Sequence, residues 1–411
     1  MTMRFAMLLL ALAVLPACVA GPLNKDSAAG ERAPPPTAPI RGVDVSMLDQ
    51  LERSGAVFRD QAGQPSELLP LLQTGGANWV RLRLWHHPVN VADVYEGGRL
   101  VSRRGEPVGG GNNDLAATLR MASKAKALGL KLLLDFHYSD FWADPGKQVK
   151  PAAWADLHGA QLRAAVHDYT RDTLLALRDA GAYPDMVQLG NETNGGMLWP
   201  DGKTWRATPD EEIGGPAGFA ELLTAAASAV RESDPRRGQA DAIRIAIHLA
   251  DGGDNELYRR VFDDLTARAV DFDVIGLSYY PYFHGPISGL RANLIDMVNR
   301  YGKPVVIMET ATGWTLDNTD SAGNVFNAER AQAGDYPVSA KGQEVLLRDL
   351  YGVLGELPAG KALGVFWWEP AWLALPGAGW RTGDGNGWEN QAWFDFQGRA
   401  LPSASAFSRI R

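Results

Sequence analysis

Cysteine is almost absent from this chain of 411 residues: Cys18 is the single one, so a disulfide within the chain is excluded. Basic residues are also few, since 40 lysines and arginines stand against 48 aspartates and glutamates, a formal net charge of −8. No cluster of lysine and arginine of the kind that follows a phosphate backbone is present. We therefore expect no nucleic acid partner.

Three catalytic signatures are missing as well. The 7 histidines form no His-Glu-x-x-His pattern, and the sequence has neither a Gly-x-Ser-x-Gly motif nor a glycine-rich phosphate loop. These absences argue against a zinc peptidase, an α/β-type serine hydrolase and a nucleotide-binding enzyme.

Long apolar runs are scarce, and the one that stands out, residues 5–14, is too short to span a bilayer comfortably. It follows Met-Thr-Met-Arg and precedes Leu-Pro-Ala-Cys, so residues 1–18 have the layout of an export signal. The place of Cys18 resembles the lipobox of bacterial lipoproteins, while the alternative is an ordinary signal cut after Ala20. We expect an exported protein that is periplasmic, anchored to the outer membrane through a lipid on Cys18, or secreted.

Residues 19–40 are rich in proline, alanine, glycine and serine and have few bulky apolar side chains, which predicts a disordered linker. No second break of this kind follows. With 45% hydrophobic and 9% aromatic residues, the chain can bury a large core. We therefore expect residues 41–411 to form one catalytic domain.

Eight short apolar or β-branched runs alternate with amphipathic stretches in this region, as in a parallel sheet covered by helices. Between the third and fourth runs, apolar residues from Leu162 to Leu177 recur at helical spacing, and Gly181 follows as a helix end. An open doubly wound sheet would place a glycine-rich turn after the first run, which is missing. The pattern predicts an α/β fold, a single (β/α)8 TIM barrel, with strands at residues 42–46, 79–84, 132–136, 186–189, 243–247, 274–278, 305–308 and 363–367.

Active sites of such barrels lie where strands end and loops begin, so polar residues just past the runs are the candidates. They are Asp44, Arg81, Arg83, Trp85, His137, Asn191, Glu192, His248, Tyr280, Glu309, Trp368 and Glu369.

Glu192 and Glu309 close the fourth and seventh runs and should face the same mouth of the barrel. Two carboxylates across one cleft suit cleavage of a glycosidic bond, with one protonated and the other ionised. We expect the charge of Glu309 to raise the pKa of Glu192 and the arginines of the second run to keep Glu309 ionised. The alternative for each glutamate is an ion pair at the rim with Arg81 or Arg83.

Several long segments together resemble glycoside hydrolase family 53, the endo-β-1,4-galactanases of clan A. They are RGVDVSML (41–48), NWVRLRLW (78–85), LLLDFHYSDFWADPGKQVKPAAW (132–154), VQLGNETNGGMLWP (187–200), FDVIGLSYYPYFHG (272–285), METATGWTLDN (308–318) and GVFWWEPAW (364–372). The resemblance implies a retaining, double-displacement endo-hydrolase of β-1,4-galactan, with Glu192 as acid/base and Glu309 as nucleophile. Retention requires the two carboxyl groups to lie roughly 5 to 5.5 Å apart.

Supporting roles follow for the other strand-end residues. We expect Arg81 and His137 to orient the carboxylates, Asn191 to hold a sugar 2-hydroxyl, and Tyr280 to donate to the nucleophile. Asp44 and His248 are further candidates for substrate binding. Platforms under the sugar rings are sought among the tryptophans, for each of which core packing is the alternative: Trp85, Trp199, Trp368 and Trp388.

Residues 317–324 carry side-chain oxygens at alternate positions, which suits a hard cation such as calcium. Some bacterial members of the family bind calcium here through an Asp-x-Asp-x-x-x-Asn pattern. In this chain Asn318 takes the first position, with Asp320 and Asn324 in the others, so the charge and the expected affinity are lower. The alternative is a turn rich in Asn and Asp without a metal. No cofactor is required for the chemistry, and calcium would be structural.

Two other functions remain open at this point. Another clan A endoglycanase, of the mannanase or xylanase type, would share the strand-end glutamates, because loops select the sugar. A surface lipoprotein that only binds glycans is the second alternative, although the presence of both glutamates argues against it. We expect a monomer with a polysaccharide as its partner and no membrane contact except through the lipid.

Overall fold

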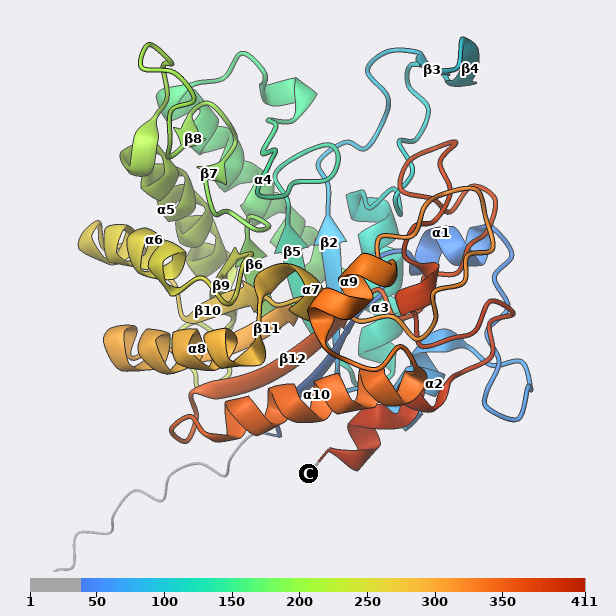
Figure 1. Cartoon of the computed structure of the whole chain (residues 1–411). Coiled ribbons are helices and arrows are strands. Elements are labelled where there is room, and N and C mark those ends of the chain that lie inside the picture. The colour runs from blue at the N-terminus through green and yellow to red at the C-terminus, as the bar shows by residue number, and fades with distance from the viewer. Residues whose placement is uncertain (1–37, 411) are drawn as a thin grey trace, which may run out of the picture. The chain divides into compact units, whose positions relative to one another are not determined.

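The computed structural model describes residues 38–410, so the predicted signal peptide and all but the end of the predicted linker lie outside the described residues. Parallel strands close into one barrel in sequence order, and the last strand pairs with the first, which confirms the predicted (β/α)8 fold (Figure 1). The strands are β1 (Ile40–Asp44), β2 (Trp79–Leu84), β5 (Lys131–Phe136), β6 (Met186–Leu189), β9 (Arg244–Leu249), β10 (Val274–Ser278), β11 (Val305–Glu309) and β12 (Ala362–Trp368).

Helices lie around the outside of this barrel (Figure 1). They are α1 (Leu48–Arg53), α2 (Leu68–Thr74), α3 (Leu115–Ala127), α4 (Gly159–Asp179), α5 (Gly215–Ser233), α6 (Asn255–Ala267), α7 (Pro281–His284), α8 (Ile287–Tyr301), α9 (Ala328–Gly334) and α10 (Ala340–Gly355), with short 3₁₀ turns η1 (Ala152–Trp154), η2 (Glu389–Gln391) and η3 (Pro402–Arg409). Within residues 38–410, no helix combines the length and apolarity needed to cross a membrane.

Two small hairpins extend from the barrel loops. The first consists of β3 (Val94–Glu96) and β4 (Arg99–Ser102), which follow β2 and stand out at the top right of Figure 1. The second consists of β7 (Gly196–Met197) and β8 (Gly202–Lys203), which follow β6.

Strand β2 shows how the alternation of side chains along a strand divides the barrel. Its residues Val80, Leu82 and Leu84 belong to the apolar cluster between strands and helices. The intervening residues point inward, so Trp79 joins the apolar cluster inside the barrel while Arg81 and Arg83, further along, are buried polar residues. The strand thus carries a hydrophobic start and a cationic end on its inner face.

The other strands repeat this division between an apolar start and a polar end. Inside the barrel, Phe366 fills the space over Gly42, where a Cβ atom would lie only 2.1 Å from its ring, so the glycine makes room for the large side chain. Towards the strand ends the interior becomes polar and remains buried, with Asp44, Arg81, Arg83, Asp135, Gln188, His248 and Ser278. The candidate chemistry therefore rests on a packed polar layer.

The predicted crossover helix is confirmed as α4, which buries Leu162, Val166 and Leu177. Gly181 follows it with a left-handed φ of 68°, as expected of a residue that ends a helix. The first strand begins and ends two residues earlier than predicted, because the side chain of Asp44 accepts from the backbone N–H of Ser46 and turns the chain out of the sheet.

Candidate active site

A cleft of about 460 Å³ opens at the carboxyl ends of the barrel strands, and both predicted catalytic glutamates line it. Glu192 follows β6 and Glu309 ends β11, so strands on different sides of the barrel bring the two carboxyl groups to one space. Six more of the candidate residues line the same cleft: Arg83, His137, Asn191, Tyr280, Trp368 and Trp388.

Both oxygens of Glu309 are held by donors. The guanidinium of Arg81 lies 2.8 Å from Oε1, and the hydroxyl of Tyr280 donates to Oε2 over 3.0 Å. Burial raises the pKa of Tyr280 well above its usual value, so its hydroxyl remains protonated and available as a donor. Glu309 itself is only 6% exposed. Its contacts match those of an ionised carboxylate fixed for attack.

Arg81 is the centre of the buried polar layer. Besides Glu309, it contacts Asp44 at 2.6 Å and Asp135 at 2.8 Å, so one cation faces three carboxylates. Asp44 is 0% exposed, and its other oxygen accepts from Ser46. Asp44 is thus fully buried outside the lining of the cleft, where it orients Arg81, and its predicted contact with substrate stays a prediction.

Arg83 does not have the role that its position suggested. Its guanidinium pairs with Glu369 at 2.7 Å and donates to the carbonyl of Gly110, and it lies 4.2 Å from the centre of the Trp142 ring. It lines the cleft, but its charge is directed to Glu369. Two arginines were expected to keep Glu309 ionised, but only Arg81 forms an ion pair with it.

Glu192 is held in a different way. Its backbone φ is 47°, in the left-handed region that few residues other than glycine adopt. Its side chain is half-buried at the cleft. The hydroxyl of Ser278 donates to Oε1 over 2.7 Å. Because Oε1 is occupied by this bond, the proton of a neutral Glu192 is best placed on Oε2.

A chain of hydrogen bonds stands behind Ser278. The side-chain amide of Gln188 donates to Nδ1 of His248 over 2.9 Å, so the proton of this imidazole is on Nε2. That N–H donates to the hydroxyl of Ser278 over 2.9 Å, which leaves the hydroxyl proton for Glu192. Burial lowers the pKa of His248 well below its usual value, so the ring is neutral. His248 is 0% exposed and supports Ser278, and its predicted contact with substrate stays a prediction.

His137 is fixed in the same manner. Its Nδ1 accepts from the indole of Trp85 over 3.2 Å and from the backbone of Ala143, so Nε2 carries the proton and donates to Asp135 over 3.1 Å. Trp85 is 0% exposed and does not line the cleft, and the sugar platform at this residue stays a prediction. Its indole holds the ring of His137 at the cleft wall.

Asn191 is placed as predicted at the cleft and is held firmly. Its carbonyl oxygen accepts from Arg81 over 3.0 Å, and its amide donates to the carbonyl of Ala143 over 2.8 Å. An amide nitrogen carries two N–H groups, so the second is free to meet a sugar hydroxyl.

The two glutamates titrate at different pH because of these contacts. Burial raises the pKa of Glu192 well above its usual value, and the charge of Glu309 raises it further, against the bond from Ser278. Burial also raises the pKa of Glu309 to about 7, while Arg81 opposes the rise. Burial is therefore the main cause of the raised pKa of Glu192, which the sequence analysis attributed to the charge of Glu309. Because Arg81 and Tyr280 stabilise only the charge on Glu309, Glu309 ionises first.

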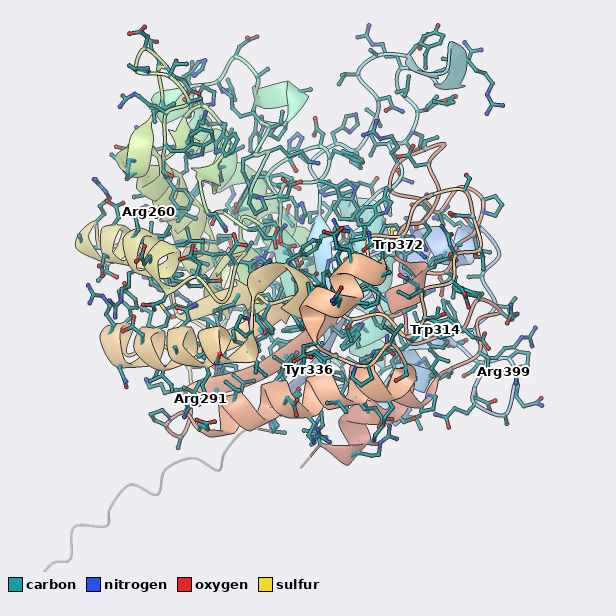
Figure 2. All side chains as sticks on the ribbon, viewed as in Figure 1. Arg260, Arg291, Trp314, Tyr336, Trp372 and Arg399 are labelled. Carbon is teal, nitrogen blue, oxygen red and sulfur yellow. The ribbon has the colours of Figure 1, made fainter. Side chains whose placement is uncertain are left out.

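Aromatic rings form one wall of the cleft. Trp368 and Trp388, both predicted platforms, pack edge to face with centroids 4.5 Å apart. Trp142 and Trp380, which sequence reasoning missed, line the same wall. Trp372, labelled in Figure 2, is fully buried against them.

Trp199, another predicted platform, lies elsewhere. Its indole donates to the carbonyl of Gly195, and its ring packs edge to face on Trp205.

The loop predicted to bind calcium closes on its own backbone. The two oxygens of Asp320 accept from the N–H groups of Ala322 and Asn386, and the Oδ1 of Asn318 accepts from the N–H of Asp320. The Oδ1 of Asn324 is buried without a partner among the described residues, but its amide donates to Asp317. No group of three or more carboxylate, histidine or cysteine side chains suited to a metal occurs within residues 38–410. Asp320 is the one carboxylate among the three predicted ligands, and both of its oxygens are already hydrogen-bonded, which suits calcium poorly. The arrangement fits the alternative, a turn rich in Asn and Asp without a metal.

Ser278, Gln188 and the two added tryptophans are the main residues that sequence reasoning missed. Ser278 is the last residue of β10 on the inward side, a position that alternation from Gly276 could have indicated. Trp142 and Trp380 lie in loops, where no periodicity indicates which way a side chain points.

Comparison with known proteins agrees with this geometry. The model of glycosyl hydrolase family 53 matches residues 40–407. An endo-β-1,4-galactanase of Bacillus subtilis (strain 168) is 34% identical over 90% of this chain and 85% of its own length. An arabinogalactan endo-β-1,4-galactanase of Cellvibrio japonicus (strain Ueda107) is 36% identical over 88% of each chain. Among solved structures, the GH53 catalytic domain of Ignisphaera aggregans has a TM-score of 0.80 and 44% identity over 90% of this chain and 95% of that one.

Proposed function

Because the chain belongs to glycosyl hydrolase family 53, we propose that it hydrolyses internal β-1,4-galactosidic bonds of galactan and arabinogalactan. The relatives that are 34% and 36% identical to this chain are named endo-β-1,4-galactanases. The observation that carries the proposal is the contrast between the two glutamates of one cleft. Glu309 has both oxygens held by Arg81 and Tyr280, whereas Glu192 has one oxygen held by Ser278 and one left for substrate.

The contrast supports a double displacement in two steps. In the first step, a carboxylate oxygen of Glu309 attacks the anomeric carbon while Glu192 transfers its proton to the departing glycosidic oxygen. This leaves a galactosyl ester on Glu309 and an ionised Glu192. In the second step Glu192 removes a proton from water, whose oxygen attacks the same carbon and releases Glu309 as a carboxylate. Two inversions at one carbon retain its configuration.

The charges of the site favour this order of events. The negative charge of Glu309 contributes to the raised pKa of Glu192. Once Glu309 is esterified this charge is gone, so the pKa of Glu192 falls when the residue must act as a base. Arg81 keeps Asp44 and Asp135 as partners in the intermediate and stays in place for the second step.

Two measurements test the proposal. Hydrolysis rates on galactan, mannan, xylan and carboxymethylcellulose rank the polysaccharides, and we expect galactan to be cleaved fastest with internal cuts. NMR of the first products should show the β-anomer. Cleavage of mannan without cleavage of galactan would contradict the substrate, and an α-anomer as first product would contradict the double displacement.

We further propose that the chain is exported and that Cys18 carries a lipid. The support is the sequence of residues 1–18, which lie outside the described residues. Mass spectrometry of the mature N-terminus in an expressing bacterium should find a modified Cys18, and Cys18→Ser should release the protein from membranes. A mature chain that begins after Ala20 would contradict the lipid anchor. We also propose a monomer, which sedimentation of the mature protein tests.

A further inference from the structure

The two glutamates divide the mouth of the barrel into two sides. Strands β10 and β9 lie between β11, which carries Glu309, and β6, which precedes Glu192, while β5, β2, β1 and β12 complete the circle on the other side (Figure 1). The aromatic wall of the cleft belongs to this other side, because its rings lie at or after the ends of β5 and β12: Trp142, Trp368, Trp380 and Trp388. Since the two carboxyl groups flank the bond that is cut, the two sugars joined by that bond extend to opposite sides.

Asp251 lines the cleft on the side of β9 and β10, two residues after the end of β9. Its side chain is 47% exposed. The amide of Asn194 donates to Oδ2 over 2.9 Å, and Nε2 of His284 lies 3.5 Å from Oδ1. Since Nδ1 of His284 accepts from the backbone N–H of Tyr280 over 3.1 Å, the ring proton is on Nε2 and faces Asp251. A carboxylate can accept about four hydrogen bonds, so this one is held in place and still has room for the hydroxyls of a ligand.

Phe283 gives the same side of the cleft an apolar surface. It lines the cleft and is 49% exposed, and it precedes His284 in α7. Its ring packs edge to face against Tyr282 with centroids 4.7 Å apart, and the ring of His284 lies between it and Asp251. A sugar has an apolar C–H face and a rim of hydroxyls, so a fixed aromatic ring near a fixed carboxylate suits a sugar ligand.

The position of Glu192 indicates which sugar this side receives. Glu192 gives its proton to the oxygen of the departing sugar, and Asp251 lies near it. Asn194, the partner of Asp251, follows Glu192 by two residues, and the charge of Asp251 raises the pKa of Glu192. Asn191, the predicted partner of the 2-hydroxyl on the attacked sugar, donates to the carbonyl of Ala143 and so lies towards β5 and the aromatic wall. The attacked sugar is therefore on the side of the wall, and the departing sugar is on the side of Asp251.

From this arrangement we propose that Asp251 and Phe283 bind the departing sugar. Asp251 accepts hydrogen bonds from its hydroxyls, and the ring of Phe283 packs against its C–H face. The inference rests on the proposed function and assigns the residues that recognise the leaving half of its substrate. Neither residue takes part in the proton transfer or the attack on the anomeric carbon.

The test compares two substrates that differ in what leaves. One is linear β-1,4-galactotetraose, and the other is the β-fluoride of β-1,4-galactobiose, in which fluoride replaces the departing sugar. Both form a galactosyl ester on Glu309, and the attack of water on that ester needs Glu192 in both cases. A variant that disturbs the glutamates therefore slows both reactions, whereas loss of a contact to the departing sugar slows only the cleavage of the tetraose.

Asp251→Gly removes the carboxylate from a residue whose φ of 56° glycine adopts freely. Asn194 keeps its bond from the backbone N–H of Ala250 in this variant, so the loop after Glu192 stays in place. We expect kcat/KM for the tetraose to fall about 10–100-fold and that for the fluoride to fall less than about threefold. Phe283→Ala changes no charge and should lower kcat/KM for the tetraose about tenfold, again with little effect on the fluoride.

Two controls separate binding from other effects. Removing the charge of Asp251 also lowers the pKa of Glu192, which moves the alkaline limb of tetraose cleavage and leaves the plateau of the pH profile. The loss is therefore measured on the plateau. Asp335 also has a left-handed φ, of 55°, and is exposed outside the lining of the cleft, so Asp335→Gly should leave both values of kcat/KM unchanged.

The possible outcomes distinguish this inference from the proposed function. If the unchanged protein cleaves both compounds, equal losses on the two in Asp251→Gly would overturn the inference alone. So would an unchanged plateau for the tetraose, or a similar loss in Asp335→Gly. Cleavage of neither compound by the unchanged protein would overturn the proposed function and this inference with it.

Discussion

Replacing Ser278 by alanine removes the hydroxyl that donates to Oε1 of Glu192 over 2.7 Å and leaves the other groups around the two glutamates in place. The charged groups that face Glu192 are Glu309, Asp144 and Asp251, all of which raise its pKa, so the serine is the opposing influence. Its loss destabilises the ionised form of Glu192. The pKa of the acid/base should rise, and the acid should become weaker.

The size of the effect follows from the bond. A hydrogen bond to a charged group contributes about 1.5 to 3 kcal/mol, and about 1.4 kcal/mol corresponds to one pH unit. Since Glu192 is half-buried, we take the lower end of this range. The alkaline limb of kcat/KM should move up by about one pH unit. The acidic limb should stay, because Arg81 and Tyr280 still hold Glu309.

The assay is the pH profile of galactan hydrolysis by the unchanged protein and by Ser278→Ala. Ser403→Ala serves as control, since Ser403 is also fully buried and its hydroxyl has no partner among the described residues. An alkaline limb that stays in place or moves down in Ser278→Ala, with the melting temperature unchanged, would refute the reasoning.

Four further predictions follow from the same contacts. Glu192→Gln and Glu309→Gln should each lose at least about 10²–10⁴-fold in kcat while the fold persists by circular dichroism, and full activity in either would remove its role. Tyr280→Phe should lower kcat about 10–100-fold and move the acidic limb upward, and a profile identical to that of the unchanged protein would count against the bond to Glu309. Burial raises the pKa of Glu369 to about 8, so the stability gained from its protonated form is complete below about pH 4.5 and is lost as pH rises through 8. Glu369→Gln should therefore flatten the fall in melting temperature between pH 5 and 9, and an unaltered slope would contradict the raised pKa of Glu369. Treatment with EDTA should leave the melting temperature unchanged, because Asp320 is satisfied by backbone groups, whereas a marked drop would restore the calcium hypothesis.

The barrel and the meeting of Glu192 and Glu309 at one cleft could be predicted because they depend on local sequence. Each strand is a short apolar run, and the carboxyl ends of parallel strands meet at one mouth, so Glu192 and Glu309 had to lie near each other. The alternation along β2 likewise sends both arginines inward.

The depth and direction of single side chains could not be predicted in the same way. Asp44 and His248 lie at or near strand ends as predicted, but both are fully buried and neither lines the cleft. Trp85 follows β2 directly, yet its backbone N–H donates to the carbonyl of Asn113 and its ring is buried against Phe141 and Trp142. The order of residues along the chain indicates neither this depth nor this turn.

The hydroxyls that donate to Glu192 and Glu309 come from Ser278 and Tyr280. Ser278 is the last residue of β10, and Tyr280 follows it two positions later. A shift of this short piece of backbone would change acid strength and nucleophile charge in the same movement. The optimum pH is thus a property of the β10 terminus, and a variant selected for work in acid or alkali has one place at which to adjust both glutamates together.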